Sequence, residues 1–487
     1  MKLINSLIAL LAPLALLACG DDSSDNNGDS SSSGNSSTVT LTSSSPANGE
    51  TDVPISTTSI QLTYSAEVNF VSGQNADFNG TQCSMTAFSK KANVMTFSIP
   101  STLKMGEQYT LSIPAGFFIS TNGSTPVPAH SVTFTTKAQT TIPVEGLAQS
   151  LVTSDPLPQA KAIYDYLLSV YGQKTLSASM ANVSWNLNEA NLVFQATGKY
   201  PAIATMDYIH LYTNRSDWTN KHWVVNYHLT DEIRQWAADG GILAASWHWM
   251  VPAYQGADPT ADGSMTTSPD DTSFKPSNMF IDGTWEKSVH DEDLALMADR
   301  LLELQNEGIA LIWRPFHEAS GNVNSGGSAW FWWGREGAEV YKQVWIDMFN
   351  YFKDKGIRNL IWVWTTQTGY GWDATKGILA DTDWYPGDEY VDIIGRDEYN
   401  TSLDASVAEY KAIAENFPNK MVTLSECGNV AKLSQQFTQG ATWSYCMPWY
   451  KYDATTLDGH DHANTEWWND AMSCEYVVSR DQLPKFE

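Results

Sequence analysis

The residues best suited to chemistry lie in the segment 311–334. An apolar run there ends at Pro315, which cannot donate a hydrogen bond to a sheet and is typical of a strand end. His317 and Glu318 follow, and four aromatic residues occupy 330–333. An acid beside apolar rings can be kept protonated, and indole faces stack on the C–H faces of sugar rings. A single Glu at a strand end, however, is more often a solvated loop residue. A catalytic role for Glu318 therefore requires a second functional group.

Glu426 is the strongest candidate for that partner. It follows the apolar run 421–425, as Glu318 follows the run 310–314 by a few residues. Glycoside hydrolysis requires two carboxyl groups that flank the scissile bond, one protonated and one ionised. In a retaining, double-displacement mechanism the two groups are about 5–5.5 Å apart. The intervening elements must therefore bring Glu318 and Glu426 to one place.

The chain after Leu151 alternates stretches of helical spacing with short apolar runs, which is typical of βα units around a parallel sheet. The eight candidate strands are 175–178, 202–206, 242–246, 310–314, 359–364, 391–395, 421–425 and 444–448. Eight units in roughly 340 residues favour an α/β fold of the (β/α)8 TIM barrel type with enlarged loops. A doubly wound open sheet is the alternative, but no glycine-rich phosphate turn follows the first strand.

Catalytic groups of such barrels lie at the carboxyl ends of strands. The residues at those ends are rich in acids, imidazoles and aromatic rings: Asp207, Tyr208, His248, His317, Glu318, Asp397, Tyr399, Glu426 and Trp449. Glu318 follows the fourth strand and Glu426 the seventh. A barrel therefore places the two acids opposite one another across its mouth.

The motifs around these residues resemble glycoside hydrolase family 26. They are WRPFHE at 313–318, WFWWG at 330–334, VDIIGRDEYN at 391–400 and LSECG at 424–428. The resemblance covers about residues 150–487. It implies a retaining endo-β-1,4-mannanase that uses no metal or other cofactor. The family also includes mixed-linkage β-glucanases and β-1,3-xylanases, so these remain alternative activities.

Carried over by position, the resemblance implies that Glu318 is the general acid/base and Glu426 the nucleophile. Tyr399 would hydrogen-bond Glu426 and hold it ionised, and Arg314 would lower its pKa by charge. The implied substrate-binding residues are His248, Arg314, His317, Trp330, Asp397, Tyr399 and Trp449, of which Trp330 and Trp449 would be sugar platforms.

Some of these assignments have structural alternatives. Arg314 could instead be a strand arginine paired to structural acids, and Asp397 could cap the next helix. For Asp397 the two interpretations are evenly balanced. The segment 322–329 is longer than the usual link in the family, and Tyr450 stands where some relatives carry Arg. The leaving-group side of the cleft is therefore where differences from relatives are expected.

The amino-terminal residues are typical of an exported lipoprotein. Residues 1–19 combine Lys2, an apolar run too short to span a membrane, and Leu16-Leu17-Ala18-Cys19, which resembles the bacterial lipoprotein processing box. A lipidated Cys19 would anchor the protein to a membrane, with the Ser-, Asp- and Asn-rich residues 20–38 as a flexible tether. Display on the outer surface of a bacterium is expected. Plain secretion with cleavage elsewhere is the alternative.

Residues 39–138 have the composition of a small β-sandwich. Short alternating runs such as 59–64 and 131–136 are separated by Gly, Pro and Asn turns. The stretch 46–54 resembles bacterial Ig-like domains. It carries no cluster of acids or exposed aromatics, which favours a spacer over a sugar-binding module. Residues 139–150 then form a linker to the barrel predicted at 151–487.

The composition argues against some classes of function and favours others. The net charge of -27 argues against a nucleic-acid partner, because phosphates would be repelled. The 20 Trp and 21 Tyr residues exceed what a core needs and favour a carbohydrate-binding surface. A non-catalytic glycan-binding protein on the same scaffold is the rival hypothesis, but it has no need for both Glu318 and Glu426. A monomer is expected.

Other reactive residues carry no assigned role. Gly321 stands where the second His of a His-Glu-x-x-His zinc site would be required. The run His460-Asp461-His462 has ligand types but no third ligand, and is interpreted as a solvated loop. Cys427, Cys446 and Cys474 could pair in an oxidising compartment, although the sequence does not determine the pairing.

Overall fold

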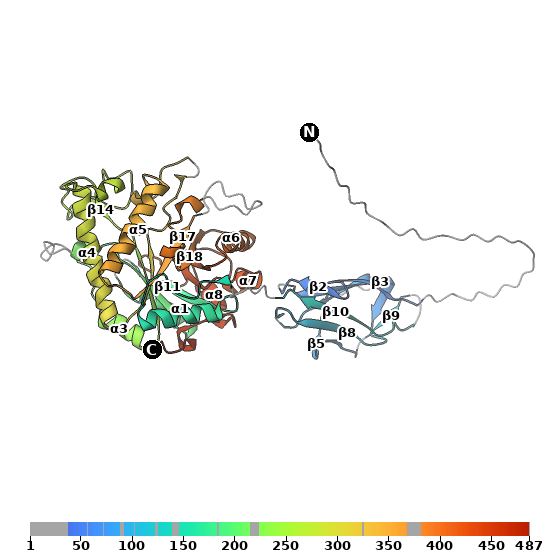
Figure 1. The fold of residues 1–487 in the computed structure, drawn as a ribbon. Coiled ribbons are helices and arrows are strands. Elements are labelled where there is room, and N and C mark those ends of the chain that lie inside the picture. The colour runs from blue at the N-terminus through green and yellow to red at the C-terminus, as the bar shows by residue number, and fades with distance from the viewer. Residues whose placement is uncertain are drawn as a thin grey trace, which may run out of the picture. The chain divides into compact units, whose positions relative to one another are not determined.

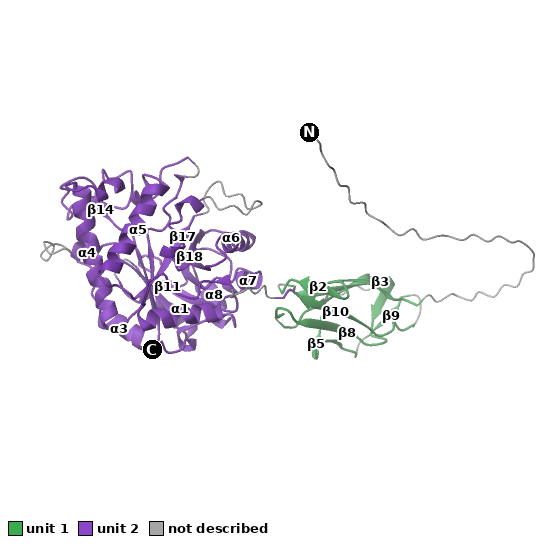
Figure 2. Cartoon of the chain, in the orientation of Figure 1, with its two compact units in different colours: residues 1–136 green, residues 137–487 purple. Residues whose placement is uncertain are grey.

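The structure, a computed structural model, describes residues 38–486 except 56, 72, 88–91, 102, 122–124, 139–145, 183–184, 215–223, 324–325 and 368–380. The chain divides into two compact units, residues 1–136 and 137–487 (Figure 2). The predicted lipoprotein segment, Cys19 included, lies outside the described residues. In the part of the chain that is described, no helix is long and apolar enough to cross a membrane.

The first unit is a sandwich of two five-stranded sheets (Figure 1). One sheet has the order β1-β3-β7-β6 with β9 also on β3, and the other has the order β2-β10-β8-β4-β5. Alternate residues face the shared core, as Val132 and Phe134 do in β10. The predicted all-β domain is thus confirmed. Its strands are β1 Leu41–Ser45, β2 Glu50–Val53, β3 Ser59–Phe70, β4 Ala76–Phe78, β5 Thr81–Cys83, β6 Met85–Ala87, β7 Ala92–Ser98, β8 Gln108–Ile113, β9 Phe118–Ser120 and β10 His130–Thr136.

The second unit is a closed barrel of eight parallel strands, in the order β12-β13-β16-β17-β18-β19-β20-β11. Strand β11 pairs with both β20 and β12, so the sheet closes on itself. This confirms the predicted (β/α)8 barrel, and each of the eight predicted strands is present with ends shifted by a few residues. The strands are β11 Thr175–Met180, β12 Ile203–Asp207, β13 Ile242–Trp247, β16 Leu311–Pro315, β17 Leu360–Thr366, β18 Ile393–Tyr399, β19 Met421–Gly428 and β20 Tyr445–Pro448.

Helices surround the barrel strands (Figure 1). In α4, Leu294, Met297 and Leu301 are fully buried on one face of the helix. The helix begins before the apolar pattern does, because the Thr284 side chain caps it by accepting the Lys287 N–H. The helices are α1 Pro158–Val170, α2 Asn188–Thr197, α3 Asp231–Ala238, α4 Trp285–Asn306, α5 Ala338–Asp354, α6 Leu403–Asn416, α7 Leu433–Thr438 and α8 Thr465–Ser473. Short strands β14 Val251–Pro252, β15 Met265–Thr266 and β21 Val477–Val478 complete the unit.

Most of the described tryptophans fill the barrel unit's core and do not form a surface. Trp313, Trp345 and Trp362, for example, lie in one buried cluster between strands and helices. Trp330 is the most exposed of the described tryptophans, at 39%. Among the described residues, the high tryptophan count therefore reflects the core more than a carbohydrate-binding surface. A (β/α)8 barrel has a broad apolar layer between strands and helices, and large side chains fill it.

Candidate active site

The chain leaves β16 through a turn with two left-handed residues. Phe316 and Glu318 have φ values of 51° and 52°, which L-residues rarely adopt unless their surroundings enforce them. Two side chains bond this backbone: Trp333 Nε1 donates to the His317 carbonyl at 3.0 Å, and Tyr341 Oη donates to the Phe316 carbonyl at 3.2 Å. The turn therefore holds Glu318 at the carboxyl end of β16.

Gly334 lets the supporting aromatic segment pack against this turn. A Cβ at Gly334 would lie 1.9 Å from the Ala319 carbonyl oxygen, so only glycine permits the approach. Trp332 and Trp333 are fully buried there, and Phe331 stacks on Trp333 with ring centroids 4.4 Å apart. Residues 331–333 therefore pack against the turn that carries Glu318.

Glu426 lies in the last part of β19 and is 6% exposed. Arg314 Nη2 is 3.1 Å from Glu426 Oε2, and Tyr399 Oη donates a hydrogen bond of 2.5 Å to Glu426 Oε1. Arg314 also forms an ion pair with Asp397. The barrel thus brings together four of the predicted site residues from the ends of β16, β18 and β19.

Burial raises the pKa of both candidate catalytic carboxyls. For Glu318 the charges of Asp397 and Glu426 add to the effect of burial, and the pKa lies well above its usual range. For Glu426, burial and Asp397 raise the pKa to about 7. Arg314 and the Tyr399 hydrogen bond oppose that rise, as predicted, but do not outweigh it. Because both of these groups contact Glu426, Glu318 is the carboxyl that keeps its proton and Glu426 is the one that ionises.

Asp397 lies behind Arg314 and does not face the cleft. Its side chain is 0% exposed, and Ser425 Oγ donates to it at 2.8 Å. The following helix, α6, is capped by Ser402. The capping alternative is therefore wrong. So is the predicted contact of Asp397 with substrate, because its carboxylate is enclosed by its own partners. Asp397 instead fixes Arg314 beside Glu426.

Two histidines predicted to bind substrate meet edge to face, with His248 and His317 ring centroids 4.2 Å apart. Asp207, the last residue of β12, forms an ion pair with His248 and accepts its backbone N–H at 3.1 Å. Burial lowers the pKa of His248, but Asp207 outweighs it and the net shift is upward. Burial and Arg314 hold the pKa of His317 well below its usual range. Asp207 stands at a strand end in the sequence, but only the structure shows its partner.

The two predicted sugar platforms have different settings. Trp449 is partly buried, with its ring centroid 5.8 Å from that of His248. Trp330 is more exposed, and its backbone nitrogen would lie 2.8 Å from a Cβ on Gly321, so that glycine lets Trp330 pack on the turn that carries Glu318. One indole therefore lies beside the histidine pair and the other beside the acid.

The remaining reactive side chains form no metal site among the described residues, where no group of three or more His, Cys, Asp or Glu could hold an ion. Cys427 and Cys446 are buried free thiols with sulfurs 3.7 Å apart, and Cys474 is also free. The His460-Asp461-His462 run is only partly solvated: His460 is buried, and the His462 ring lies 5.5 Å from that of Tyr399. His462 is a neighbour of the site that its sequence context did not reveal.

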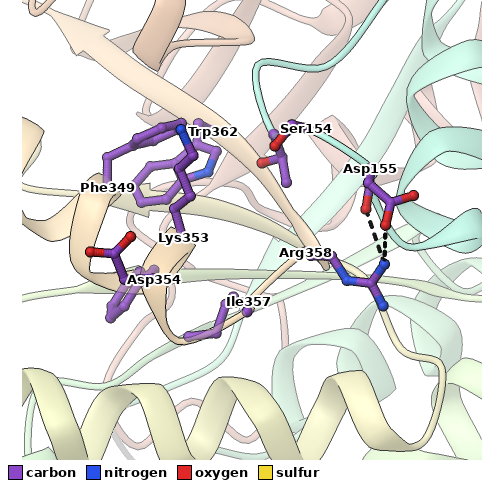
Figure 3. A pocket seen from close by; sticks show the side chains of 11 residues that line it. Ser154, Asp155, Phe349, Lys353, Asp354, Ile357, Arg358 and Trp362 are labelled. Atoms are coloured by element: carbon purple, nitrogen blue, oxygen red, sulfur yellow. Dashed lines mark hydrogen bonds and ion pairs between the residues drawn. The ribbon is translucent and has the colours of Figure 1, made fainter.

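A cavity of about 460 Å³ lies at the amino-terminal end of β17 (Figure 3). It is lined by Ser154, Asp155, Phe349 and Arg358, among others, and Arg358 Nη1 is 2.6 Å from Asp155 Oδ2. Arg358 precedes the first residue of β17, whereas the site residues stand at the carboxyl ends of strands. This cavity is separate from the candidate active site.

Comparison with known families matches both units. Residues 152–475 match the family model described as Glycosyl hydrolase family 26, and residues 35–136 match the one described as Bacterial Ig-like domain. Mannan endo-1,4-beta-mannosidase B of Piromyces sp is 29% identical over 350 residues, which are 70% of this chain and 54% of that protein. Mannan endo-1,4-beta-mannosidase A of the same organism is also 29% identical, with 51% of its length covered. The chain thus spans about half the length of these two curated relatives.

Solved structures are similar over the barrel unit. The GH26 domain of an endo-beta-mannanase/endo-beta-glucanase from Prevotella bryantii is 40% identical with a TM-score of 0.63, over 69% of this chain and 99% of that one. A beta-mannanase from a symbiotic protist of the termite Reticulitermes speratus, solved with a gluco-manno-oligosaccharide, is 30% identical with a TM-score of 0.55, over 70% of this chain and 99% of that one.

Proposed function

Because the chain belongs to glycosyl hydrolase family 26, we propose that it is an endo-acting β-1,4-mannanase that retains the configuration of the anomeric carbon. One observation carries the proposal: the charge of Glu426 acts on the half-buried Glu318, while Arg314 and Tyr399 contact the buried Glu426 and not Glu318. The substrate class comes from similar proteins, which are named mannan endo-1,4-beta-mannosidases.

In the first step, the ionised Glu426 attacks the anomeric carbon of a bound β-mannosyl unit. Glu318 gives its proton to the glycosidic oxygen as the carbon–oxygen bond breaks, so the leaving chain departs as a neutral alcohol. The mannosyl unit is then held as an ester of Glu426. This step needs one protonated and one charged carboxyl, which is the division that the two environments produce.

In the second step, Glu318 acts as a base. Esterification removes the charge of Glu426, which is one of the causes that raise the pKa of Glu318. The ionised Glu318 can then take a proton from water while the water oxygen attacks the anomeric carbon and Glu426 leaves. Two inversions restore the original configuration, and the proton count of the pair returns to its starting value.

The polysaccharide that is cut provides the direct test. Incubation with linear mannan, glucomannan, mixed-linkage β-glucan and β-1,3-xylan should yield soluble oligosaccharides of several lengths from the two mannans only. Chromatographic sizing of the early products, together with a rapid fall in viscosity, measures endo-acting cleavage. NMR of the first product formed should show the β-anomer.

Other outcomes of the same assay identify the alternatives. Cleavage of only the mixed-linkage glucan or only the xylan would contradict the mannan assignment and indicate a related activity of the family. Retention of mannan without cleavage would indicate a non-catalytic glycan-binding protein. The Glu426→Gln variant is the matched control, because it keeps the shape of the site and removes the nucleophile.

We also propose that Cys19 is lipidated and that the protein is displayed on the outer surface of a bacterium. The basis is the basic start, apolar run and small residue before Cys19, followed by a polar tether. The full chain should partition with membranes and incorporate a radiolabelled fatty acid, and Cys19→Ser should do neither. Membrane association of the Cys19→Ser variant would contradict the anchor, and protection of the full chain from protease added to whole cells would contradict surface display.

A further inference from the structure

Tyr399 has to hold a fixed position although it lies at an exposed edge. It is the last residue of β18 and the residue is 37% exposed, yet its hydroxyl is 2.5 Å from Glu426 Oε1. A strand-end tyrosine with one face in solvent can adopt other rotamers unless its ring is packed. The contacts of that ring therefore determine how well the hydrogen bond to Glu426 is maintained.

Gly428 provides the space in which the Tyr399 ring is packed. Tyr399 and Gly428 are partners in register on β18 and β19. A Cβ on Gly428 would lie 2.7 Å from Cδ1 and from Cε1 of Tyr399, and 2.2 Å from Nδ1 of His462. Gly428 is not among the glycines with positive φ, so the glycine is required by space and not by backbone conformation. Two rings therefore occupy the volume that a side chain at position 428 would fill.

The second ring belongs to His462, from the loop that joins β20 to α8. Its ring meets that of Tyr399 at 77° with centroids 5.5 Å apart, an edge-to-face contact. The His462 carbonyl accepts the Asn429 N–H at 2.8 Å, which ties the loop to the end of β19. His462 thus packs its ring against that of Tyr399 and is held there by the backbone at the end of β19.

A buried histidine anchors this loop. His460 Nδ1 lies 3.2 Å from the backbone nitrogens of His462 and Ala463 and accepts their N–H groups. Its Nε2 lies 3.3 Å from Glu189 Oε2 on α2, a close approach that lacks hydrogen-bond geometry. The other oxygen of Glu189 accepts the Lys451 N–H at 3.2 Å. Both ends of the loop therefore contact one side chain of α2, Glu189, and the Lys451 end does so through a hydrogen bond.

We propose that His462 is a positioning residue for the nucleophile, and that it acts by packing the Tyr399 ring so that the tyrosine hydroxyl stays on Glu426. The proposal rests on the function proposed above, because it assigns Glu426 as the nucleophile. It also gives Gly428 a role: the absence of a side chain at that position admits both rings.

The charges around His462 and around Glu426 are compatible with a positioning role for His462. Burial and His460 lower the pKa of His462, so its ring is neutral near pH 7 and adds no cation to the site. The other charged groups that face His462 are Asp461, Glu189 and Lys451.

The groups that face Glu426 are Asp397, Arg314, Tyr399 and His248, with Glu318 across the site. His462 is not among the main groups that shift the pKa of Glu426, whereas its ring contacts that of Tyr399. The proposed effect of His462 on Glu426 therefore acts through Tyr399.

The test is the pH dependence of kcat/KM, whose acidic limb reports ionisation of the nucleophile in the free enzyme. The Tyr399 hydrogen bond lowers the pKa of Glu426, so loosening it must move the acidic limb to higher pH. Tyr399→Phe should move the limb by about one unit, since a hydrogen bond to a charged group is worth roughly that much. His462→Ala should move it in the same direction by about half as much, and should lower kcat roughly tenfold through misplacement of the nucleophile. His462→Phe, which keeps a ring in place, should restore the parent profile.

Two further variants separate packing from direct action. In the Tyr399→Phe background, His462→Ala should cause no additional shift of the acidic limb. Gly428→Ala leaves His462 and Tyr399 chemically unchanged but displaces both rings, and should shift the limb as His462→Ala does. If His462→Ala does not fold, Gly428→Ala still tests whether packing of the Tyr399 ring affects the acidic limb. His228→Ala is the matched control, because His228 is a 58% exposed histidine paired with Glu303, and its profile should equal that of the parent.

The outcomes are distinguishable from those of the proposed function. If the parent protein does not cut mannan, the proposed function fails and the positioning role falls with it. If the parent is active but His462→Ala and Gly428→Ala leave the acidic limb unchanged, only the positioning role is wrong. An equal shift by His462→Ala in the parent and Tyr399→Phe backgrounds would also overturn it, because His462 would then act independently of the tyrosine.

Discussion

Glu318→Ala and Glu426→Ala are each expected to abolish nearly all mannan hydrolysis while leaving the protein folded. General acid–base catalysis contributes roughly 10²–10⁴-fold to rate, so loss of Glu318 should cost at least this range on a substrate with a poor leaving group. Loss of Glu426 should cost more, because no covalent intermediate can form. The measurement is kcat on mannan beside the thermal unfolding midpoint. Near-parent activity in either variant would refute the assignment.

Small anions can separate the two roles. Azide should restore turnover to Glu426→Ala by entering from the side of the missing nucleophile, and the product should be the α-mannosyl azide. In Glu318→Ala, azide should attack the ester on Glu426 from the opposite face and give the β-mannosyl azide, because this step then needs no base. Identification of the anomer by NMR assigns each carboxyl. The same anomer from both variants would contradict the proposed division.

Glu398→Gln is the matched control for these variants. Glu398 is another buried carboxyl on β18, and burial raises its pKa to about 7. Its hydrogen bond, however, goes to Ser406 on α6, away from Glu426. The variant should retain hydrolysis. That result would show that a raised pKa alone does not make a carboxyl essential for activity, and that the contacts of Glu426 distinguish it.

Arg314→Met is expected to impair both stability and activity. The substitution leaves Asp397 and Glu426 buried without the cation that contacts both. Removing one partner of a buried ion pair costs about 3–5 kcal/mol in the free energy of unfolding. Protonation of Glu426 can relieve part of that cost, but it removes the nucleophile. Denaturant unfolding at pH 7 and kcat on mannan should therefore fall together, and the residual activity should rise with pH.

Asp397→Asn tests this explanation. In the double variant Arg314→Met with Asp397→Asn, one of the two uncompensated charges is absent, so much of the lost stability should return. Activity should not return, because Glu426 still lacks its cation. If the double variant were as unstable as Arg314→Met alone, the loss would arise from packing of the arginine side chain and not from its charge.

The barrel could be predicted because each strand is a short apolar run followed by a polar strand end. Parallel strands in a closed barrel all point the same way, so residues at their carboxyl ends must meet even when they are far apart in sequence. That argument was sufficient to pair Glu318 with Glu426. It also identified Asp397 as a neighbour, but it could not distinguish a residue in the cleft from one behind Arg314, because the two positions differ by the direction of a single side chain.

Contacts between loops were less predictable. His462 lies in a stretch without periodicity, and its neighbour Tyr399 is on a different strand. Gly428 leaves the space that both rings occupy. In the sequence, nothing marks this glycine after Glu426-Cys427 as important. Tryptophan content was misleading for a related reason: an indole that stacks on a sugar and an indole that fills a helix–barrel interface are the same letter. Trp330 is 39% exposed and Trp313 is fully buried, so the two residues have opposite surroundings.

The turn that carries Glu318 has a consequence for how this enzyme can diversify. Its left-handed backbone is held by Trp333 and Tyr341, which come from beyond the long segment 322–329. Both of these hydrogen bonds to the turn therefore come from outside that segment. We therefore expect changes in the length or composition of 322–329 to leave the turn that carries Glu318 in place. The substrate could then change during evolution through this segment, while the carboxyl of Glu318 keeps its position.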